Sequence, residues 1–547
     1  MRCAVLDIRT VTAAELARWE TAAEPERRAR WQQFRRPDDR ARSICADHLA
    51  RTLLREAGAQ TPVIRVGRNG KPYVPDGPAF NCSHSGNFVC CAVHGGPVGI
   101  DLEARRRGAS VYLADRVLPM LPERLCNDLC SLRPDEDRLA MTVDISLDAR
   151  GRVQGARMYP SVIRSRVRLA YGEADRLLEA GEAAAAEGGP DSALARKLAH
   201  VAAEGTDLVE VLRTADDLAR LRRTVRERRG ALDFDTVEVH ALLDEAGKPY
   251  ELTCRKRTAA TSLVEEAMLL ANECVAAYLT RRGVASAFRV HDAPDPDHLQ
   301  GAASALVELG VIDRTLGLAI SAGSQEAMRR AIDEAAGTSV FELVNALLLR
   351  AMQRAVYRPD NEGHYALGAE AYCHFTSPIR RYPDLIVHRT LKLALARERL
   401  GARAVRERAP RLTGAGREGL DAVLPALCRA CSERERIADA AAHASQKVEV
   451  ARYYGERIGE QYHAVISWVS EMGAFARMDD TQAEGLIHLR DLGDEWFDFD
   501  GRQLALVGSV SGRAVRPGNR VIVEVLSANP ARGHLDLALV TSPRALH

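Results

Sequence analysis

The amino-acid sequence predicts an α+β protein made of several domains. At 547 residues the chain is too long for one hydrophobic core, and its length favours three or four domains. Amphipathic helical stretches and alternating strands follow one another through most of the chain, which indicates mixed domains. Residues 455–539 alternate as short strands alone, which indicates an all-β domain at the C-terminal end.

Composition limits the compartment and the partners. Charged residues make up 28% of the chain, but the net charge is only +1, so any nucleic-acid binding must come from local grooves. The twelve cysteines are scattered without zinc-site spacing, which predicts free thiols in a reducing compartment. The N-terminus reads as a strand rather than a signal peptide, and no run of eighteen apolar residues occurs. We therefore expect a cytoplasmic protein that does not contact a membrane.

The first hundred residues predict a small α/β module. Residues 35–55 form an amphipathic helix, with Ile44, Leu49, Leu53 and Leu54 turned inward and arginines outward. Strands are expected near the start of the chain and around residues 63–66 and 88–93.

Three short motifs follow in this module: GKPY at 70–73, NCSHSG at 81–86 and GIDLE at 99–103. Asp101 and Glu103 alternate along a strand, so both carboxylates point to one face, where oxygen ligands suit Mg²⁺. A solvated strand face is the alternative for these two residues.

Together, the helix and the three motifs resemble the first half of a 4′-phosphopantetheinyl transferase of the surfactin-synthetase type. That family moves phosphopantetheine from coenzyme A to a carrier protein and uses magnesium. The resemblance implies coenzyme A contacts from Arg40, Lys71, Ser83 and His84. It also implies that Asp101 and Glu103 bind the metal. The second half of that family, with its W-x-x-K-E-A-x-x-K helix, is not found downstream, so residues 1–105 are predicted to be a partial module.

The central feature of the chain is the stretch YCHFTSPIRRYPDLIVHR at 372–389. Pro378 fixes a backbone torsion just before Arg380 and Arg381, so both guanidinium groups leave the chain in a defined direction. Arginine forks match phosphate oxygens through paired, charge-assisted hydrogen bonds. Phosphate binding is therefore the favoured interpretation, and solvated arginines at a helix start are the alternative.

This stretch resembles the signature of the ribonuclease II and ribonuclease R family, the RNB family, whose members digest RNA from its 3′ end. The resemblance runs from Gly108 to the C-terminus, and the body it defines spans residues 106–454. The D-x-E-A string at 101–104 could belong to either family, which makes it a plausible junction. In the body the resemblance implies catalytic or phosphate-binding roles for Arg380 and Arg381. It implies single-stranded RNA contacts for Tyr112, Phe288, His374 and His388. Core packing is the alternative for Phe288.

Elements of the body are expected as follows. Residues 108–139 carry Pro119 and Pro122 and are predicted to be an ordered loop without regular structure. Strands are predicted at 141–145 and 153–158, and a strand is implied at 287–292. Helices are predicted at 218–229, 262–280 and 341–357. The very basic helix at 218–229 is expected to be a solvated face.

The catalytic aspartates of the RNB family are missing from this sequence. That family holds two magnesium ions with carboxylates spaced D-x5-D-x-D-D, and the pattern occurs nowhere in the chain. The acidic runs at 135–137 and 479–480 have the wrong spacing. The resemblance therefore implies Mg²⁺ as cofactor but an incomplete site and impaired hydrolysis.

The C-terminal strands resemble the OB-type RNA-binding barrel, assigned to residues 455–542. Five strands are expected around 465–467, 473–476, 484–488, 518–523 and 535–537. Phe475 and His488 would form a base-stacking face, with Arg477 and Arg520 meeting phosphates. A structural barrel without RNA is the alternative.

Three functions follow as hypotheses. The first is a ribonuclease R-like 3′-to-5′ exoribonuclease homologue that binds single-stranded RNA with impaired hydrolysis. The second is a purely non-catalytic RNA-binding protein of the same fold. The third is a 4′-phosphopantetheinyl transferase that acts on carrier proteins with coenzyme A.

Overall fold

The computed structural model describes residues 2–34, 36–60, 62–66, 72–75, 77–85, 88–94, 108–186, 192–234, 238–255, 257–338, 340–401, 419–501 and 504–540. The chain divides into two compact units, Met1–Arg106 and Arg107–His547. In the described part of the chain, no helix is both long and apolar enough to cross a membrane.

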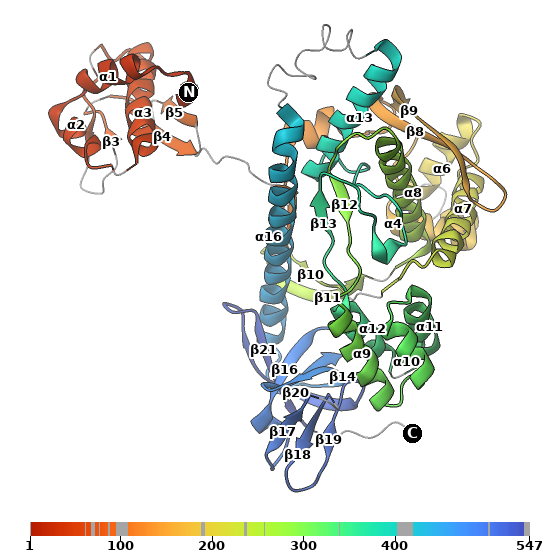
Figure 1. The fold of residues 1–547 in the computed structure, drawn as a ribbon. Helices are drawn as coiled ribbons and strands as arrows, with labels where there is room; N and C mark the ends of the chain where they lie inside the picture. Colours follow the sequence, from red (N-terminus) through yellow and green to blue (C-terminus); the bar gives the residue numbers. More distant parts are fainter. Residues whose placement is uncertain are drawn as a thin grey trace. The chain divides into compact units, whose positions relative to one another are not determined.

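The N-terminal unit is a three-stranded antiparallel sheet with helices (Figure 1). The strand order is β1-β5-β4, with β1 at Arg2–Asp7, β4 at Ala79–Ser85 and β5 at Phe88–His94. The other elements are α1 (Ala13–Thr21), α2 (Pro25–Trp31), α3 (Pro37–Glu56), β2 (Arg65–Val66) and β3 (Pro72–Tyr73). The predicted helix at 35–55 is confirmed as α3, whose Leu49, Leu53 and Leu54 are buried in one cluster with residues of β4 and β5.

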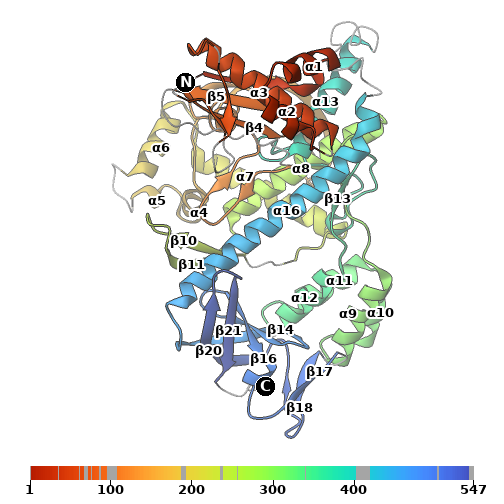
Figure 2. The same ribbon diagram turned by 90° about the vertical axis from the view of Figure 1, so that its left-hand side faces the viewer.

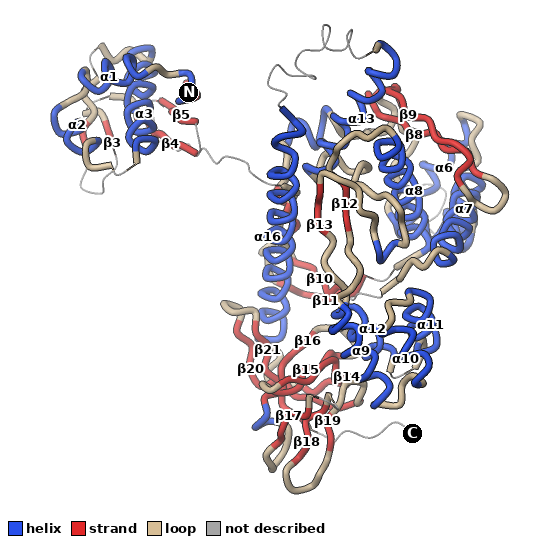
Figure 3. Tube along the Cα trace, in the orientation of Figure 1, coloured by secondary structure: helices blue, strands red, loops and turns tan. Residues whose placement is uncertain are grey.

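The second unit begins with a nuclease-like body of helices and paired strands (Figure 3). Its helices are α4 (Tyr171–Ala180), α5 (Ala183–Ala186), α6 (Ala193–Ala203), α7 (Leu208–Arg228), α8 (Ala259–Arg281), α9 (Pro296–Glu308), α10 (Arg314–Ser321), α11 (Gln325–Ala335), α12 (Phe341–Ala351), α13 (Tyr382–Leu400) and α16 (Gly419–Gly455). Its antiparallel pairs are β6 (Val111–Tyr112) with β7 (Val117–Leu118), β8 (Asp137–Leu147) with β9 (Val153–Arg164), β10 (Glu238–Leu243) with β11 (Pro249–Arg255), and β12 (Phe288–Val290) with β13 (Val356–Arg358). The helix predicted at 262–280 and the strands at 141–145, 153–158 and 287–292 are confirmed.

Two predicted elements of the body are wrong in part. The helix predicted over 341–357 ends at Ala351, because the chain turns extended at Met352 and Tyr357 then pairs with Arg289 of β12. The loop predicted over 108–139 contains the β6–β7 pair and a short π-helix, Arg124–Leu129. In the first case pairing with a distant strand outweighs the local pattern, and in the second a short hairpin forms before Pro119.

The expectation that the basic helix at 218–229 is a solvated face holds for only part of its arginines, since Arg220, Arg223 and Arg228 are exposed. This segment is the C-terminal half of α7, which packs against α8, and Arg222 and Arg226 are buried. Arg226 pairs with Glu266 of α8, and Arg222 lies against Glu273 and donates to the carbonyl of Gly151. Two acids on the partner helix, the buried Glu266 and the partly buried Glu273, therefore stabilise these arginines inside the protein.

The C-terminal strands close into the predicted barrel. Its order is β14 (Gln461–Ser470), β15 (Gly473–Met478), β16 (Glu484–His488), β21 (His534–Leu539) and β20 (Arg520–Asn529). A further three-stranded sheet was not anticipated, formed by β17 (Phe497–Asp500), β18 (Ala505–Gly508) and β19 (Ala514–Val515). Gly473 has a φ of +142°, and a Cβ there would collide with the carbonyl of Ile487, so this strand start requires glycine.

One hydrophobic cluster joins the barrel to helices α9 to α12. It includes Leu306 and Leu348 from the helices and Ile466 and Val523 from the barrel. The long helix α16 runs from the body to the barrel, as both views show (Figures 1 and 2), and it contacts β13, β11 and β20 along the way. The barrel is therefore fixed to the body through a shared core and a continuous helix.

Candidate functional site

The central stretch forms a turn held between two buried side chains. Asn272 of α8 accepts hydrogen bonds at Oδ1 from the backbone N–H groups of Phe375 (2.9 Å) and Thr376 (3.3 Å). Asp384, in the first turn of α13, accepts at Oδ1 from the backbone N–H of Ser377 (2.6 Å). Three consecutive N–H groups are thus satisfied by side chains, which fixes a segment outside regular structure.

The two adjacent arginines have different surroundings. Arg381 forms a two-point ion pair with Asp384, at 2.9 Å for both Nη2–Oδ1 and Nε–Oδ2, and the Asp384 side chain is 0% exposed. Arg380 is exposed, and its guanidinium group has no side-chain partner among the described residues. Of the two predicted phosphate ligands, Arg380 is the one whose guanidinium forms no ion pair with the described residues.

The segment that carries Tyr112 lies directly against this turn. The backbone N–H of Ser110 donates to the carbonyl of Arg380 at 2.9 Å, and the N–H of Tyr382 donates to the carbonyl of Gly108 at 2.9 Å. A Cβ at Gly108 would lie 2.8 Å from Cβ of Arg434 on α16, so glycine permits this close approach. Tyr112, two residues after Ser110, is 48% exposed, so its ring is accessible.

Neutral imidazoles lie behind the turn. Burial, with the Arg381 and Arg289 guanidinium groups nearby, holds the pKa of His374 well below its ordinary value. The hydroxyl of Tyr357 lies 2.8 Å from Nδ1 of His374. Burial, followed by the neighbouring His291, lowers the pKa of His364 to about 3. These rings therefore carry no charge at neutral pH.

Two other predicted RNA contacts are engaged inside the protein. Phe288 is 2% exposed and belongs to the core cluster, so base stacking by its ring would require its neighbours to move. His388 is stacked on Phe375 at 4.2 Å between ring centroids, and its Nε2 lies 2.9 Å from the carbonyl of Phe375. RNA contact by these residues stays a prediction.

The barrel face places Phe475 and His488 on the same side. Gly473 pairs with His488 and Phe475 with Leu486, so these side chains point to one face of the β15–β16 pair. His488 Nε2 lies 3.2 Å from Asp536. The predicted phosphate role of Arg477 is less favourable, because its guanidinium pairs with Glu342 of α12 at 2.6 Å and the side chain is 17% exposed.

Part of that barrel face is covered by α12. Trp468 pairs with Phe475 across β14 and β15, and the Arg350 guanidinium lies 3.5 Å from the centroid of the Trp468 ring. Arg520 is exposed and lies 3.4 Å from Asp479. The base-stacking surface expected from the sequence therefore begins at Phe475 and His488 and is bounded by α12.

Three of the predicted coenzyme A ligands of the N-terminal module, Arg40, Ser83 and His84, lie on described elements. Arg40 lies on α3 and pairs with Glu20 at 2.7 Å. Ser83 and His84 lie on β4. Lys71, Asp101 and Glu103 lie outside the described residues.

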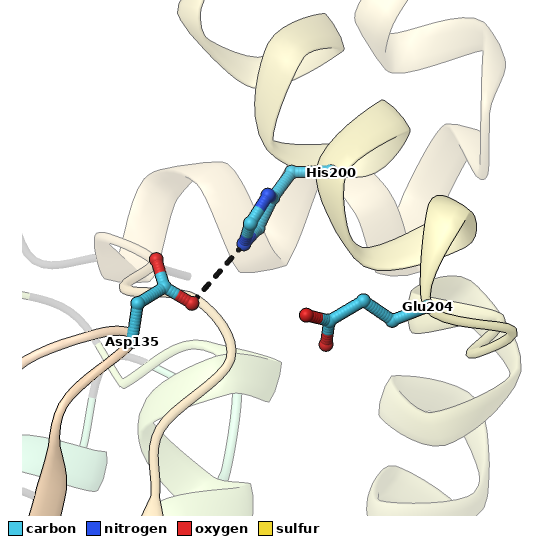
Figure 4. A group of neighbouring side chains, drawn as sticks. All are labelled: Asp135, His200 and Glu204. Atoms are coloured by element: carbon cyan, nitrogen blue, oxygen red, sulfur yellow. Dashed lines mark hydrogen bonds and ion pairs between the residues drawn. The ribbon is translucent and has the colours of Figure 1, made fainter.

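The described residues around the arginine turn do not fit a two-metal site. Two nearby acids are engaged, Asp384 with Arg381 and Glu435 with Arg289. Burial, followed by the neighbouring Glu435, raises the pKa of Asp439 on α16. In the described portion of the chain, the group of three potential ligands that come within reach of one ion consists of Asp135, His200 and Glu204 (Figure 4). All three are exposed, and Arg166 already pairs with Glu204. No step of a metal-dependent reaction is assigned to these residues.

Sequence reasoning missed the anchors of the turn. Asn272 lies within the helix predicted at 262–280 and Asp384 within the 372–389 stretch, but the sequence predicts no site role for either. Asp384 stands three residues after Arg381, at the helix start, a spacing that brings two side chains together on a helix and could have indicated the pair. Asn272 is separated from the turn by about a hundred residues of sequence, and only tertiary structure brings them together.

Comparison with known proteins agrees with this architecture. The RNB domain model matches residues 98–397, and the S1 RNA binding domain model matches residues 456–539. Ribonuclease R of Thermotoga maritima is 35% identical over 442 residues, which cover 81% of this chain and 58% of that protein. Ribonuclease R of Aquifex aeolicus is 36% identical over 441 residues, 80% of this chain and 57% of that protein.

A solved structure of a related protein has a similar fold. Mycoplasma genitalium RNase R in complex with ribose methylated single-stranded RNA is similar with a TM-score of 0.69 and 25% identity, over 85% of this chain and 68% of that one. The chain spans a little over half the length of the curated relatives named above. Because the RNB domain model matches more than half of its residues, the chain belongs to the RNB family, with an S1 barrel following the RNB domain.

Proposed function

We propose that this chain is a ribonuclease R-like, 3′-to-5′ exoribonuclease homologue that binds single-stranded RNA and hydrolyses it poorly or not at all. The proposal rests on the difference between Arg380, which has no ion-pair partner among the described residues, and two acids near it, which are paired with other arginines. Arg380 offers an exposed guanidinium, and Tyr112 is exposed on the segment that packs against the turn. Of the nearby acids, Asp384 and Glu435 are each paired with an arginine. Such a site can bind a phosphate and stack a base.

Binding is proposed to run from the turn to the barrel. Arg380 would contact a backbone phosphate and Tyr112 a base near it. At the far end of α16, Phe475 and His488 would stack further bases. The Mycoplasma genitalium enzyme has been solved with single-stranded RNA, which supports RNA as the ligand of this fold. The RNA contacts of Phe288, His374, His388 and Arg381 remain weaker parts of the proposal, because these side chains have internal partners.

Impaired hydrolysis is proposed on chemical grounds. Mg²⁺ is the metal implied by the family resemblance, and hydrolysis through two ions needs several carboxylates at one place. The D-x5-D-x-D-D pattern does not occur in the sequence, and the described surroundings of Arg380 do not replace it. A non-catalytic RNA-binding protein is the limiting case of the same proposal.

The test is incubation of the full chain with a 3′-tailed, fluorescent single-stranded RNA and Mg²⁺. We expect binding without shortening, and weaker binding by Arg380→Ala. Arg314→Ala removes an exposed arginine from α10 and serves as the charge-matched control. Release of mononucleotides by the wild-type chain would refute impaired hydrolysis, and equal affinities of the two variants would refute the role of Arg380.

The transferase alternative concerns the N-terminal unit alone. It proposes that Arg40, Lys71, Ser83 and His84 hold coenzyme A and that Asp101 and Glu103 hold Mg²⁺, with a carrier protein as acceptor. The second half of that family is not found in the sequence, so we expect no transfer of label from coenzyme A to a carrier protein. Detectable transfer would overturn that expectation.

A further inference from the structure

The arginine turn lies outside the helices and strands, and its backbone contacts with other segments are those of Arg380, Arg381 and Tyr382 with residues 108–110. Residues 375–381 connect the end of the β12-facing segment to α13. The backbone N–H groups of residues 375–377 donate to two side chains, whereas those of Arg380 and Arg381 donate to the carbonyl of Ser377. An exposed arginine on a free loop would sample many directions, which would cost affinity for each phosphate it binds. Whatever fixes this turn therefore decides how well Arg380 can bind RNA.

The side chain of Asn272 forms hydrogen bonds with two residues of the turn and with Tyr372, which precedes it. Its Oδ1 accepts from the N–H groups of Phe375 and Thr376, and its Nδ2 donates to the hydroxyl oxygen of Tyr372 at 3.1 Å. Its backbone carbonyl also accepts from the thiol of Cys373 at 3.5 Å. The side chain is buried, so none of these bonds can be replaced by bulk water without loss.

Asp384 holds the other end of the turn. It accepts from Ser377 N–H and binds Arg381 in a two-point ion pair, while its side chain is wholly buried. A buried carboxylate needs such a partner, because an unpaired buried charge is strongly destabilising. The pair turns Arg381 inward, and the next guanidinium along the chain, that of Arg380, faces solvent.

We propose that Asn272 and Asp384 are positioning residues that fix the 375–381 turn and direct the Arg380 guanidinium toward an RNA phosphate, with Arg381 as the counter-ion of Asp384. This inference rests on the proposed function of Arg380 and extends it to residues that do not touch RNA. It predicts that Asn272 acts on RNA only through Arg380.

The test is a double-mutant cycle on the full chain with a fluorescent single-stranded adenylate RNA. Affinity is measured over a range of salt concentrations for wild type, Asn272→Ala, Arg380→Ala and the double variant. Each single variant should weaken binding by about tenfold, the loss of one charge-assisted hydrogen-bonding group. Each should also reduce the salt slope by about 0.7, the value for one phosphate contact on a single strand. The double variant should bind no more weakly than Arg380→Ala.

Two further variants separate positioning from stability. Asn272→Asp keeps the acceptor for both N–H groups of the turn, so its salt slope should stay near that of wild type even where its melting temperature falls. Leu177→Ala creates a cavity in a different cluster and should lower the melting temperature without changing the salt slope. Arg381→Ala should lower the melting temperature, whereas Arg380→Ala should not.

The outcomes distinguish a failure of this inference from a failure of the proposed role of Arg380 in RNA binding. An unchanged affinity and salt slope for Arg380→Ala would refute the role of Arg380, and the inference would fall with it. A clear effect of Arg380→Ala combined with an unchanged slope for Asn272→Ala would refute the inference alone. Equal effects of Asn272→Ala in the wild-type and Arg380→Ala backgrounds would do the same, because they would show action independent of Arg380.

Discussion

The buried pair between Arg226 and Glu266 gives the sharpest prediction of stability. The two side chains are 4% and 3% exposed and join α7 to α8. Three contacts connect them, two from Nε at 3.0 and 3.1 Å and one from Nη2 at 2.5 Å. Arg226→Met leaves the Glu266 carboxylate buried without its partner, so we expect the free energy of unfolding to fall by about 3–5 kcal/mol.

Replacing both partners should remove most of that cost. The double variant Arg226→Met with Glu266→Leu buries no charge, and well-packed apolar replacements of buried pairs are often neutral or stabilising. Arg330→Ala is the control, because Arg330 and Glu334 form an exposed pair on α11 whose loss should cost at most about 0.5 kcal/mol. Differential scanning calorimetry is the suitable assay, since it can resolve the unfolding transitions of the two compact units. A cost for Arg226→Met as small as that of the control would refute the reasoning, as would a double variant no more stable than the single one.

Three further predictions concern pH, base contact and metal. His364 has a folded-state pKa of about 3 against 6.5 for the free side chain, so the unfolded chain binds the extra proton and stability should fall as pH drops from 6.5 toward 3. The slope should approach about 1.4 kcal/mol per pH unit for this residue. His364→Phe should reduce this slope when the melting temperature is measured as a function of pH in the acid range. An unchanged slope in the variant would contradict this account. Tyr112→Ala should weaken RNA binding by about tenfold through lost stacking while the salt slope is kept, whereas a reduced slope would indicate a phosphate contact instead. Chelation of divalent ions with EDTA should leave RNA affinity measured by fluorescence anisotropy within about twofold, since the binding contacts proposed here are arginine and aromatic groups; a large loss would mean that a metal ion takes part in binding.

The sequence predicted most of the elements whose pattern is local. The helix at 262–280 and the five barrel strands follow from apolar periodicity, and the structure has them as α8 and as β14, β15, β16, β20 and β21. The end of α12 was not predictable in this way. Its apolar pattern continues toward Tyr357, and only pairing with β12 draws that residue into a strand.

At the site, the sequence by itself determined which residue types are present, and tertiary structure decided what each one does. Two neighbouring arginines are equivalent in a sequence, but the buried carboxylate of Asp384 binds Arg381 and leaves Arg380 exposed. The basic stretch of α7 looked solvated because Glu266 and Glu273, which neutralise it, lie on another helix. The physical reason is the same in both cases. The environment of a charge depends on partners that are distant along the chain, and only the folded structure brings them within hydrogen-bonding distance.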